Sequence, residues 1–376
     1  MVAADQAAAV PVPTPSTEPS AEPSAAPGFA QALAAGPIVL DGGLSNQLEA
    51  QGQDLSDPLW SARLLADDPA QIAAAHQAYF AAGAQVAITS SYQASYPGFA
   101  ARGIGRAEAT ALLRRSVELA RQARRAADER DARAGEPAPD RWVAASVGPY
   151  GAVLADGSEY RGRYGLSVAE LEAFHAPRLE TLIGAGPDLL ALETIPDTDE
   201  ARALLNLVRG SGVPCWISFS AVGACTRAGQ ALSNAFALAA EVDEVVAVGV
   251  NCCAPQDVRA AVEIAGAITG KPVVVYPNSG EVWDAEARGW REEPSFDPGL
   301  VRGWIGAGAR LIGGCCRVGP DAIGAVAAAV RAASQDTYTG GGAGAGGAAG
   351  GPGPADAVAF VERSRAKFAR PRAVRR

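Results

Sequence analysis

The sequence predicts a single-domain (β/α)₈ barrel, a TIM barrel, on the strength of three observations. Short apolar runs rich in β-branched residues alternate with longer Ala- and Leu-rich stretches of helical periodicity along most of the 376-residue chain. Eight such pairs fit within about 300 residues, which is the number that closes a barrel of parallel strands. No glycine-rich dinucleotide loop follows the first strand, which disfavours the main alternative, a doubly wound open sheet.

The strand candidates are nearly continuous apolar runs, as expected of parallel strands that are covered on both faces. They begin with PIVLD and end with ARLIGG. In chain order the predicted strands span 37–41, 85–90, 141–147, 187–193, 213–220, 245–251, 272–277 and 309–314.

A stretch of helical periodicity follows each strand candidate. The predicted helices span 69–82, 106–130, 167–184, 198–209, 230–241, 255–268, 298–307 and 320–333. Two of them open with a helix start signal, Asp68-Pro69 and Asp197-Thr198. Others are followed by glycines such as Gly83, Gly186 and Gly308, which readily take the left-handed conformation that ends helices.

Both ends of the chain depart from the barrel pattern. Residues 1–27 are rich in Pro, Ala, Ser and Glu and predict a disordered leader without the basic start or apolar core of an export signal. We therefore place the barrel domain at 28–334. Residues 335–376 hold a flexible glycine-rich linker, at 340–353, and a basic tail, which we expect to be solvated. Contact of the tail with RNA or an anionic surface is the alternative.

Composition limits the partners and the compartment. Apolar residues make up 48% of the chain, and the net charge is −9, which argues against nucleic acid or an anionic membrane as the main partner. No apolar run approaches the roughly 18 residues that span a bilayer. We therefore expect a cytoplasmic protein that acts on small molecules and whose six cysteines are thiols. The sequence leaves the oligomeric state open.

Polar residues gather where the predicted strands end. The carboxyl ends of all strands in this architecture share one rim, and that rim holds the active site. The residues at these ends are Asp41, Thr89 to Gln93, Gly148 to Tyr150, Glu193, Asn251, Cys252, Tyr276, Asn278, Cys315 and Cys316.

Three rim cysteines predict a zinc site. Cys252, in GVNCC, and the Cys315–Cys316 pair, in GGCCR, follow strands that lie two apart around the barrel. Three thiolates suit tetrahedral zinc, and no fourth cysteine or histidine stands at the rim, so an open catalytic position is expected. We expect Gly313-Gly314 to let the backbone bend so that both sulfurs turn inward. The positive end of the helix near Pro320 would favour thiolate.

The remaining cysteines and histidines are expected to play no part in this site. Cys215 should be core, Cys225 inert in a loop, and Cys253 should face away from the metal because it alternates with Cys252. A strained disulfide within the vicinal pair is an alternative that needs an oxidising setting. His76 and His175 should be surface or packing residues.

Two carboxylates stand out at the ends of apolar strands. Asp41 follows the first strand in LDGG, and Glu193 closes the fourth in LLALE. Little nearby in the sequence would neutralise them, so a clamp for an ammonium group is one interpretation. Helix capping or a rim salt bridge is the other.

Ordered motifs across the whole predicted barrel resemble one family. They are LDGGLSNQLEAQG (40–52), DPLWSARLL (57–65), AITSSYQAS (87–95), SVGPYGAVLADGSEYRGRY (146–164), ETIPD (193–197), GVNC (249–252), VVYPNSGE (274–281) and RLIGGCCR (310–317). Together they resemble the homocysteine S-methyltransferases, from about residue 28 to 333. SSYQAS, ADGSEYRG and YPNSGE are closest to the branch that uses S-methylmethionine or S-adenosylmethionine.

The resemblance implies roles for individual residues. It implies that Cys252, Cys315 and Cys316 bind a catalytic Zn²⁺ and that Asp41 and Glu193 hold the homocysteine ammonium. It places Asn278 at the open zinc position before substrate arrives. It puts Tyr92, Gln93 and Tyr276 on the donor side of a substrate site that also includes Asn251. The implied reaction is methyl transfer to homocysteine, which makes methionine.

One loop departs from the family pattern. After strand five the family reads like SFTLRDG, whereas this chain has SFSAVGACTRAGQAL at 218–232. Betaine or another donor is therefore the first alternative. A non-catalytic zinc or redox-sensing barrel and a metal-free lyase are alternatives of other classes, and the lyase leaves the rim cysteines without a function.

Overall fold

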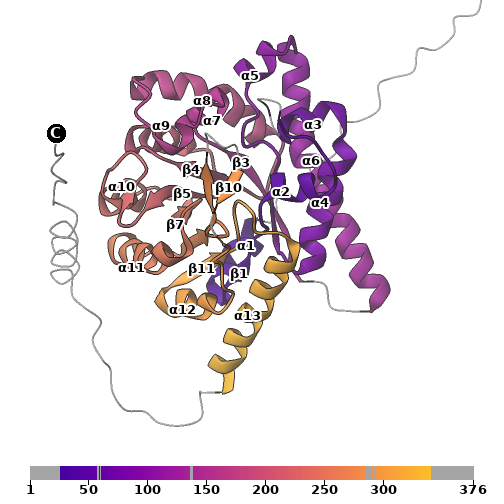
Figure 1. The fold of residues 1–376 in the computed structure, drawn as a ribbon, viewed down its shortest axis with the longest axis vertical. Coiled ribbons are helices and arrows are strands. Elements are labelled where there is room, and N and C mark those ends of the chain that lie inside the picture. The colour runs from indigo at the N-terminus through magenta and orange to yellow at the C-terminus, as the bar shows by residue number, and fades with distance from the viewer. Residues whose placement is uncertain are drawn as a thin grey trace, which may run out of the picture.

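The protein is a closed barrel of parallel strands. The computed structural model describes residues 26–339, apart from 57–58, 60, 136–138, 285–288 and 292. Its barrel strands are β1 (Ile38–Val39), β2 (Val86–Ile88), β3 (Trp142–Val147), β4 (Leu189–Ile195), β5 (Cys215–Val222), β7 (Val245–Asn251), β8 (Val273–Tyr276) and β11 (Ala309–Ile312). All pair in parallel, in the order β1-β11-β8-β7-β5-β4-β3-β2 (Figure 1). A bridge from Leu40 to Val86 closes the ring, which confirms the predicted fold class.

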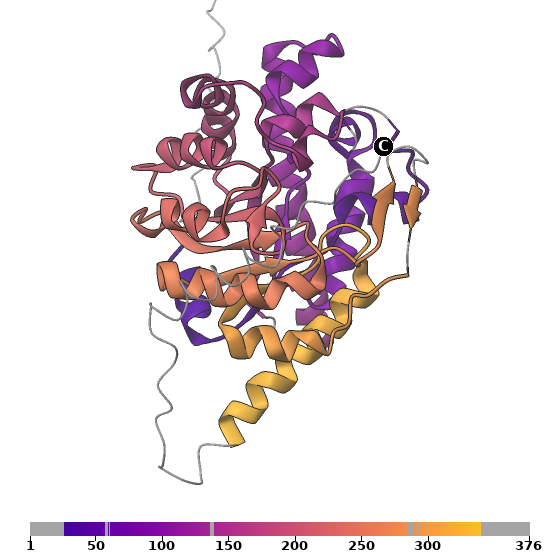
Figure 2. The ribbon, with the colours of Figure 1, turned by 60° about the vertical axis from the view of Figure 1, so that its left-hand side comes forward.

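Helices surround the strands, one after each, as the sequence predicts (Figures 1 and 2). They are α4 (Pro69–Ala82), α6 (Arg106–Ala134), α8 (Val168–Gly184), α9 (Thr198–Val208), α10 (Leu232–Ala240), α11 (Val258–Thr269), α12 (Leu300–Ala307) and α13 (Pro320–Thr339). The Asp197 side chain caps α9 by accepting from the Asp199 amide at 2.9 Å. Gly83 and Gly308 end α4 and α12 in the left-handed conformation.

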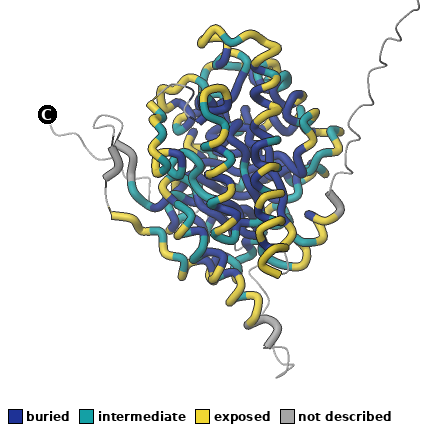
Figure 3. Tube along the Cα trace, turned by 90° about the vertical axis from the view of Figure 1, so that its right-hand side faces the viewer, coloured by how far each residue is buried: buried dark blue, intermediate teal, exposed yellow. Residues whose placement is uncertain are grey.

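The buried hydrophobic residues form two clusters, an outer and an inner layer of the core. Figure 3 shows that the buried residues lie in the interior of the molecule. The outer layer packs the strands against the helices, and the inner layer fills the barrel. Helix α1 (Ala26–Ala35), which the sequence analysis did not predict, adds Phe29 and Leu33 to the inner layer. The Phe29 ring meets Trp142, at the start of β3, edge to face at 5.3 Å. Helix α1 therefore covers the amino-terminal end of the barrel, opposite the rim where the polar residues lie.

Further short elements occupy the loops between the main strands and helices. They are α2 (Leu44–Ala50), α3 (Ser61–Asp67), α5 (Tyr96–Ala101), α7 (Tyr150–Leu154), η1 (Ser158–Tyr160), β6 (Cys225–Thr226), η2 (Pro255–Asp257) and the hairpin of β9 (Val282–Asp284) with β10 (Gly289–Arg291). Residues 1–25 of the predicted leader, the glycine-rich linker and the basic tail lie outside the described residues. In the described part, no helix has the length and apolar character needed to cross a membrane.

Candidate metal and substrate site

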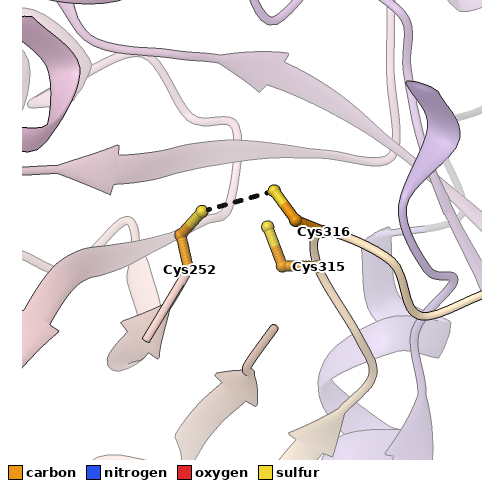
Figure 4. Close-up of side chains that lie close together, drawn as sticks. All are labelled: Cys252, Cys315 and Cys316. Carbon is orange, nitrogen blue, oxygen red and sulfur yellow. Dashed lines mark hydrogen bonds between the residues drawn. The ribbon is translucent and has the colours of Figure 1, made fainter. Parts of the chain in front are cut away.

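The three predicted cysteines come together at the carboxyl ends of two strands. Cys252 directly follows β7, and the Cys315–Cys316 pair follows β11 after two glycines. Their sulfur atoms lie within 4.8 Å of one another, and the Sγ atoms of Cys252 and Cys316 are 3.8 Å apart (Figure 4). A disulfide would need about 2.05 Å. The structure therefore presents three free thiols that converge on one point.

The loop after β8 holds both cysteine segments in place, because β8 lies between β7 and β11 in the sheet. On one side, the Cys252 amide donates to the Tyr276 carbonyl at 3.2 Å, and the Asn278 amide donates to the Cys253 carbonyl at 2.9 Å. On the other side, the Cys315 amide donates to the Pro277 carbonyl at 2.8 Å. The Cys316 amide donates to Oδ1 of Asn278 at 3.2 Å. The side chain of Asn278 thus fixes the third cysteine through its backbone.

Local backbone geometry turns the sulfurs inward, although not for the reason expected. Cys252 itself has a left-handed φ of 50°, whereas neither Gly313 nor Gly314 has a positive φ. Those glycines are needed for close packing instead. A Cβ on Gly313 would meet the Asp41 carbonyl oxygen at 2.6 Å, and one on Gly314 would meet Val318 at 2.1 Å.

The thiols do not titrate independently. Hydrogen bonds from Cys315 and Cys316 lower the pKa of Cys252, so this thiol loses its proton first. The pKa values of the other two rise because each donates to the Cys252 sulfur and lies beside its charge. The cluster thus holds one thiolate readily and needs a cation to hold three.

Two buried carboxylates lie near the thiols. Asp41 is 1% exposed and Glu193 is 7% exposed. Burial and the charge of Glu193 raise the pKa of Asp41, and burial raises the pKa of Glu193 to about 7. Oδ2 of Asp41 accepts from the Ile88 amide at 2.8 Å, whereas Oδ1 has no partner among the described residues. Glu193 accepts a hydrogen bond from the Ser146 hydroxyl.

An irregularity in β4 aims Glu193 into the barrel. The pairing of β4 with β5 shifts between Leu192 and Ile195, and Thr194 has a left-handed φ of 60°. Asn251, at the end of β7, holds this bend. Its Oδ1 accepts from the Thr194 amide at 2.8 Å, and its Nδ2 donates to the Thr194 hydroxyl at 2.7 Å. Ser218 also donates to Oδ1 of Asn251 at 2.8 Å, so the polar atoms of Asn251 all bond to protein groups.

Three tyrosines line the space beside the thiols. The Tyr276 hydroxyl accepts from Trp216 Nε1 at 3.0 Å, and its pKa is raised by burial and by Glu193. Burial and the charges of Glu159 and Cys252 raise the pKa of Tyr92, which is half-buried. The hydroxyl of Tyr160 lies 3.7 Å from the Cys252 sulfur.

The comparisons with known proteins establish the family of the chain. A family model described as homocysteine S-methyltransferase matches residues 38–330. The chain belongs to the homocysteine S-methyltransferase family. It is 46% identical over 316 residues to homocysteine S-methyltransferase 4 of Zea mays, covering 81% of this chain and 92% of the relative. It is also 46% identical over 296 residues to the Escherichia coli homocysteine S-methyltransferase, covering 77% and 94% of the two chains.

Solved structures of the family have the same fold. The metallated form of the homocysteine methyltransferase MmuM from Escherichia coli superposes with a TM-score of 0.69 at 45% identity. That match covers 78% of this chain and 96% of the other. The oxidized form gives 0.70 at 44% identity, over 78% and 95% of the chains. The protein is therefore an enzyme of a methyltransferase family.

The sequence analysis did not single out Glu159 and Tyr160, although it quoted the motif ADGSEYRG that contains them. The sequence did contain a signal for them: the motif places an acidic residue next to an aromatic one, in a loop bounded by glycines at the rim of the barrel. Gln93, which was singled out, donates from Nε2 to the Ala152 carbonyl at 3.2 Å and so braces α7.

The other cysteines and histidines of the methyltransferase barrel lie outside the thiol cluster. Cys215 and Cys253 are buried in the outer apolar layer, and burial raises the pKa of each thiol. Cys225 lies in the short strand β6 rather than in a loop. His76 and His175 are both fully buried, and Nε2 of His175 pairs with Glu200 at 2.8 Å. Of the two expectations for the histidines, surface or packing, their burial agrees with packing.

Proposed function

We propose that this enzyme transfers a methyl group from a sulfonium donor, S-methylmethionine or S-adenosylmethionine, to the thiol of homocysteine, and so makes methionine. The observation that carries the proposal is the cluster of Cys252, Cys315 and Cys316 beside the buried carboxylates Asp41 and Glu193. The relatives, which are homocysteine S-methyltransferases, support homocysteine as the acceptor. The motifs SSYQAS and YPNSGE favour a sulfonium donor.

We further propose that the three cysteines bind zinc. Tetrahedral zinc with Zn–S bonds of about 2.3 Å separates its sulfur ligands by about 3.8 Å. The separation between Cys252 and Cys316 is 3.8 Å, before any adjustment to an ion. A zinc ion bound there supplies a positive charge that lowers the pKa of the substrate thiol. Asn278, whose Oδ1 accepts from the Cys316 amide at 3.2 Å, would occupy the open position until the substrate thiol displaces it.

Asp41 and Glu193 suit the ammonium group of homocysteine. Each carboxylate is buried with a raised pKa, and the two repel one another. A buried carboxylate is stabilised by a cation close to it, and Oδ1 of Asp41 is a free acceptor for an N–H donor. Binding homocysteine would relieve both the desolvation and the repulsion.

The remaining predicted residues would orient the substrates. Tyr92, whose pKa is raised by burial and by the charges of Glu159 and Cys252, and Tyr276, whose pKa is raised by burial and by Glu193, would line the donor side. Gln93 would support them through its hydrogen bond to α7. Asn251 shapes the bend that presents Glu193. The reaction is an in-line displacement: the thiolate donates an electron pair to the methyl carbon, and the pair of the breaking bond remains on the donor sulfur. No general base is needed, so alignment is the main contribution of the protein.

The experiment combines metal analysis with a donor panel. Purified protein should hold about one zinc per chain and make methionine from homocysteine with S-methylmethionine or S-adenosylmethionine. Cys316→Ala should lose most of the zinc and nearly all activity. Cys253→Ala, which alters the adjacent buried thiol outside the cluster, should retain both.

Each alternative predicts a different result in that experiment. Turnover with betaine alone would identify a donor of another class. Bound zinc without turnover of any donor would indicate a sensor. Full zinc and full rate in Cys316→Ala would exclude the three-thiolate site.

A further inference from the structure

A third buried carboxylate, Glu159, adjoins the cysteine cluster and has no role in the mechanism above. Glu159 lies in η1, at 4% exposure. Its Oε2 has no hydrogen-bond partner in the described part of the chain. None of the ion pairs formed by the described residues includes it. Among the described residues, Glu159 thus has no ion-pair partner; the nearby guanidinium of Arg227 lies over the Tyr160 ring, 5.6 Å from its centroid.

Glu159 faces the same space as the thiols. Burial and then the charge of Glu159 raise the pKa of Tyr92. The charge of Cys252, burial and, to a smaller extent, the charge of Glu159 raise the pKa of Tyr160. Burial and the charge of Cys252 in turn raise the pKa of Glu159. Tyr160, the next residue, reaches the Cys252 sulfur at 3.7 Å. Glu159 and Glu193 therefore both adjoin Cys252, one from the loop after β3 and the other from β4.

The segment that carries Glu159 is firmly built. Gly151 packs directly against it, because a Cβ there would meet the Glu159 backbone nitrogen at 2.5 Å. The Ser158 amide donates to Oδ1 of Asp156 at 2.9 Å, and Arg161 donates to the Ser158 hydroxyl at 2.9 Å. The carboxylate is thus held at the rim by its backbone and is not a side chain that folds in from solvent.

A count of charges indicates what Glu159 binds. Homocysteine brings one ammonium group, and Asp41 and Glu193 together account for it. Burial raises the pKa of Glu159 to about 7, so ionising it without a partner is costly. The second substrate brings two further positive charges, its own ammonium group and its sulfonium. Of these, the sulfonium must come to the thiols, because it carries the methyl group that reacts.

We propose that Glu159 binds the sulfonium centre of the methyl donor, beside Tyr92 and Tyr160. This inference rests on the proposed function and deepens it. A sulfonium ion has no N–H group to donate, so it is held by a nearby negative charge and by the electron-rich faces of aromatic rings. Glu159 and the two tyrosines supply both.

The attraction acts on the donor and not on the product. When the methyl–sulfur bond breaks, the electron pair stays on the donor sulfur, which becomes a neutral thioether. The charge that Glu159 holds therefore fades as the reaction proceeds. Glu159 therefore lowers the KM for the donor and does not raise kcat, because it holds the charged ground state more tightly than the transition state, and it lets the neutral product leave.

The test compares S-methylmethionine with an analogue of the same shape that lacks the sulfonium charge. Homoleucine has the shape of S-methylmethionine with a CH group in place of S⁺. Calorimetry on the full-length protein, without homocysteine, should give tighter binding of S-methylmethionine to the wild type. Glu159→Gln keeps the shape of the side chain, and it should weaken S-methylmethionine binding at least about tenfold while leaving homoleucine binding unchanged. Asp156→Asn removes an exposed charge from the same loop and should bind like the wild type.

Kinetics complete the test. Glu159→Gln should raise the KM for the donor and leave kcat at or above the wild-type value, with the KM for homocysteine and the zinc content near wild type. A wild type that binds both ligands equally, or a Glu159→Gln variant that still prefers the sulfonium, would overturn the inference. If the wild type prefers the sulfonium yet makes no methionine, the proposed reaction fails and the sulfonium site stands.

Discussion

Replacing Asn251 with alanine should uncouple the bend in β4 from the rest of the barrel. Asn251 makes three buried hydrogen bonds, two to Thr194 and one to Ser218. The two hydroxyls can rotate toward other acceptors, but the Thr194 amide cannot. Its orphaned N–H costs about 1–3 kcal/mol, and the other two bonds contribute about 0.5–1.5 kcal/mol each. We therefore expect a loss of about 2–6 kcal/mol in the free energy of unfolding.

The left-handed conformation of Thr194 makes a second contribution to the free energy of unfolding, and this contribution depends on Asn251. Such a backbone costs roughly 1–2 kcal/mol for a residue with a side chain, and Asn251 holds it there. Thr194→Gly removes both this strain and the hydroxyl that Asn251 bonds. Asn251→Ala should consequently cost at least about 1 kcal/mol less in the Thr194→Gly background than in the wild type.

Urea unfolding of the wild type, both single variants and the double variant measures this coupling. Asn206→Ala is the matched control, because Asn206 donates to Glu172 at 2.6 Å on the exposed surface and should cost under about 0.5 kcal/mol. The KM for homocysteine should rise in Asn251→Ala, since Glu193 loses its support. Additive effects of the two substitutions within about 0.5 kcal/mol would refute the reasoning.

Two further predictions concern stability. Burial lowers the pKa of His76 from 6.5 to about 4, so the neutral ring stabilises the fold above pH 6.5 and this contribution is lost as the pH falls toward 4. Relative to His76→Leu, the wild type should lose about 2 kcal/mol between pH 7 and pH 5 by urea unfolding, and parallel curves would contradict this. A Cβ on Gly249 would meet the Val274 carbonyl oxygen at 1.8 Å, whereas one on Gly266, in α11, meets nothing within 4 Å. Gly249→Ala should cost about 3 kcal/mol or more and Gly266→Ala should gain up to about 1 kcal/mol in thermal melts, and equal shifts would sink the packing argument.

The repeating elements of the barrel were predictable because parallel strands and amphipathic helices leave periodic traces in the sequence. The short elements around the rim were not. Residues such as those of α7 and η1 lack periodicity, and their conformation depends on contacts like that of Gly151 with Glu159. Helix α1 was missed for a related reason: ten residues that follow a proline-rich stretch show no clear apolar face, and only Phe29 and Leu33 are buried.

Part of the candidate site could also be predicted from the sequence. The convergence of the cysteines was predictable from their positions at two strand ends, because the barrel topology brings those ends together. The role of Gly313 and Gly314 could not be predicted, because the sequence does not distinguish a glycine that adopts a positive φ from one that is needed for close packing. Glu159 escaped notice because its lack of a partner is a property of the folded chain.

The positions of the thiols in the strand order have a consequence for biosynthesis. A chain emerging from the ribosome presents Asp41 first and Glu193 halfway, but Cys252 belongs to the sixth barrel strand and the vicinal pair follows the eighth. The three sulfurs meet only after β11 has inserted between β8 and β1 and closed the ring. A nascent or truncated chain therefore has no complete thiol cluster with which to capture a metal. The proposed zinc would therefore load only into molecules whose barrel has closed.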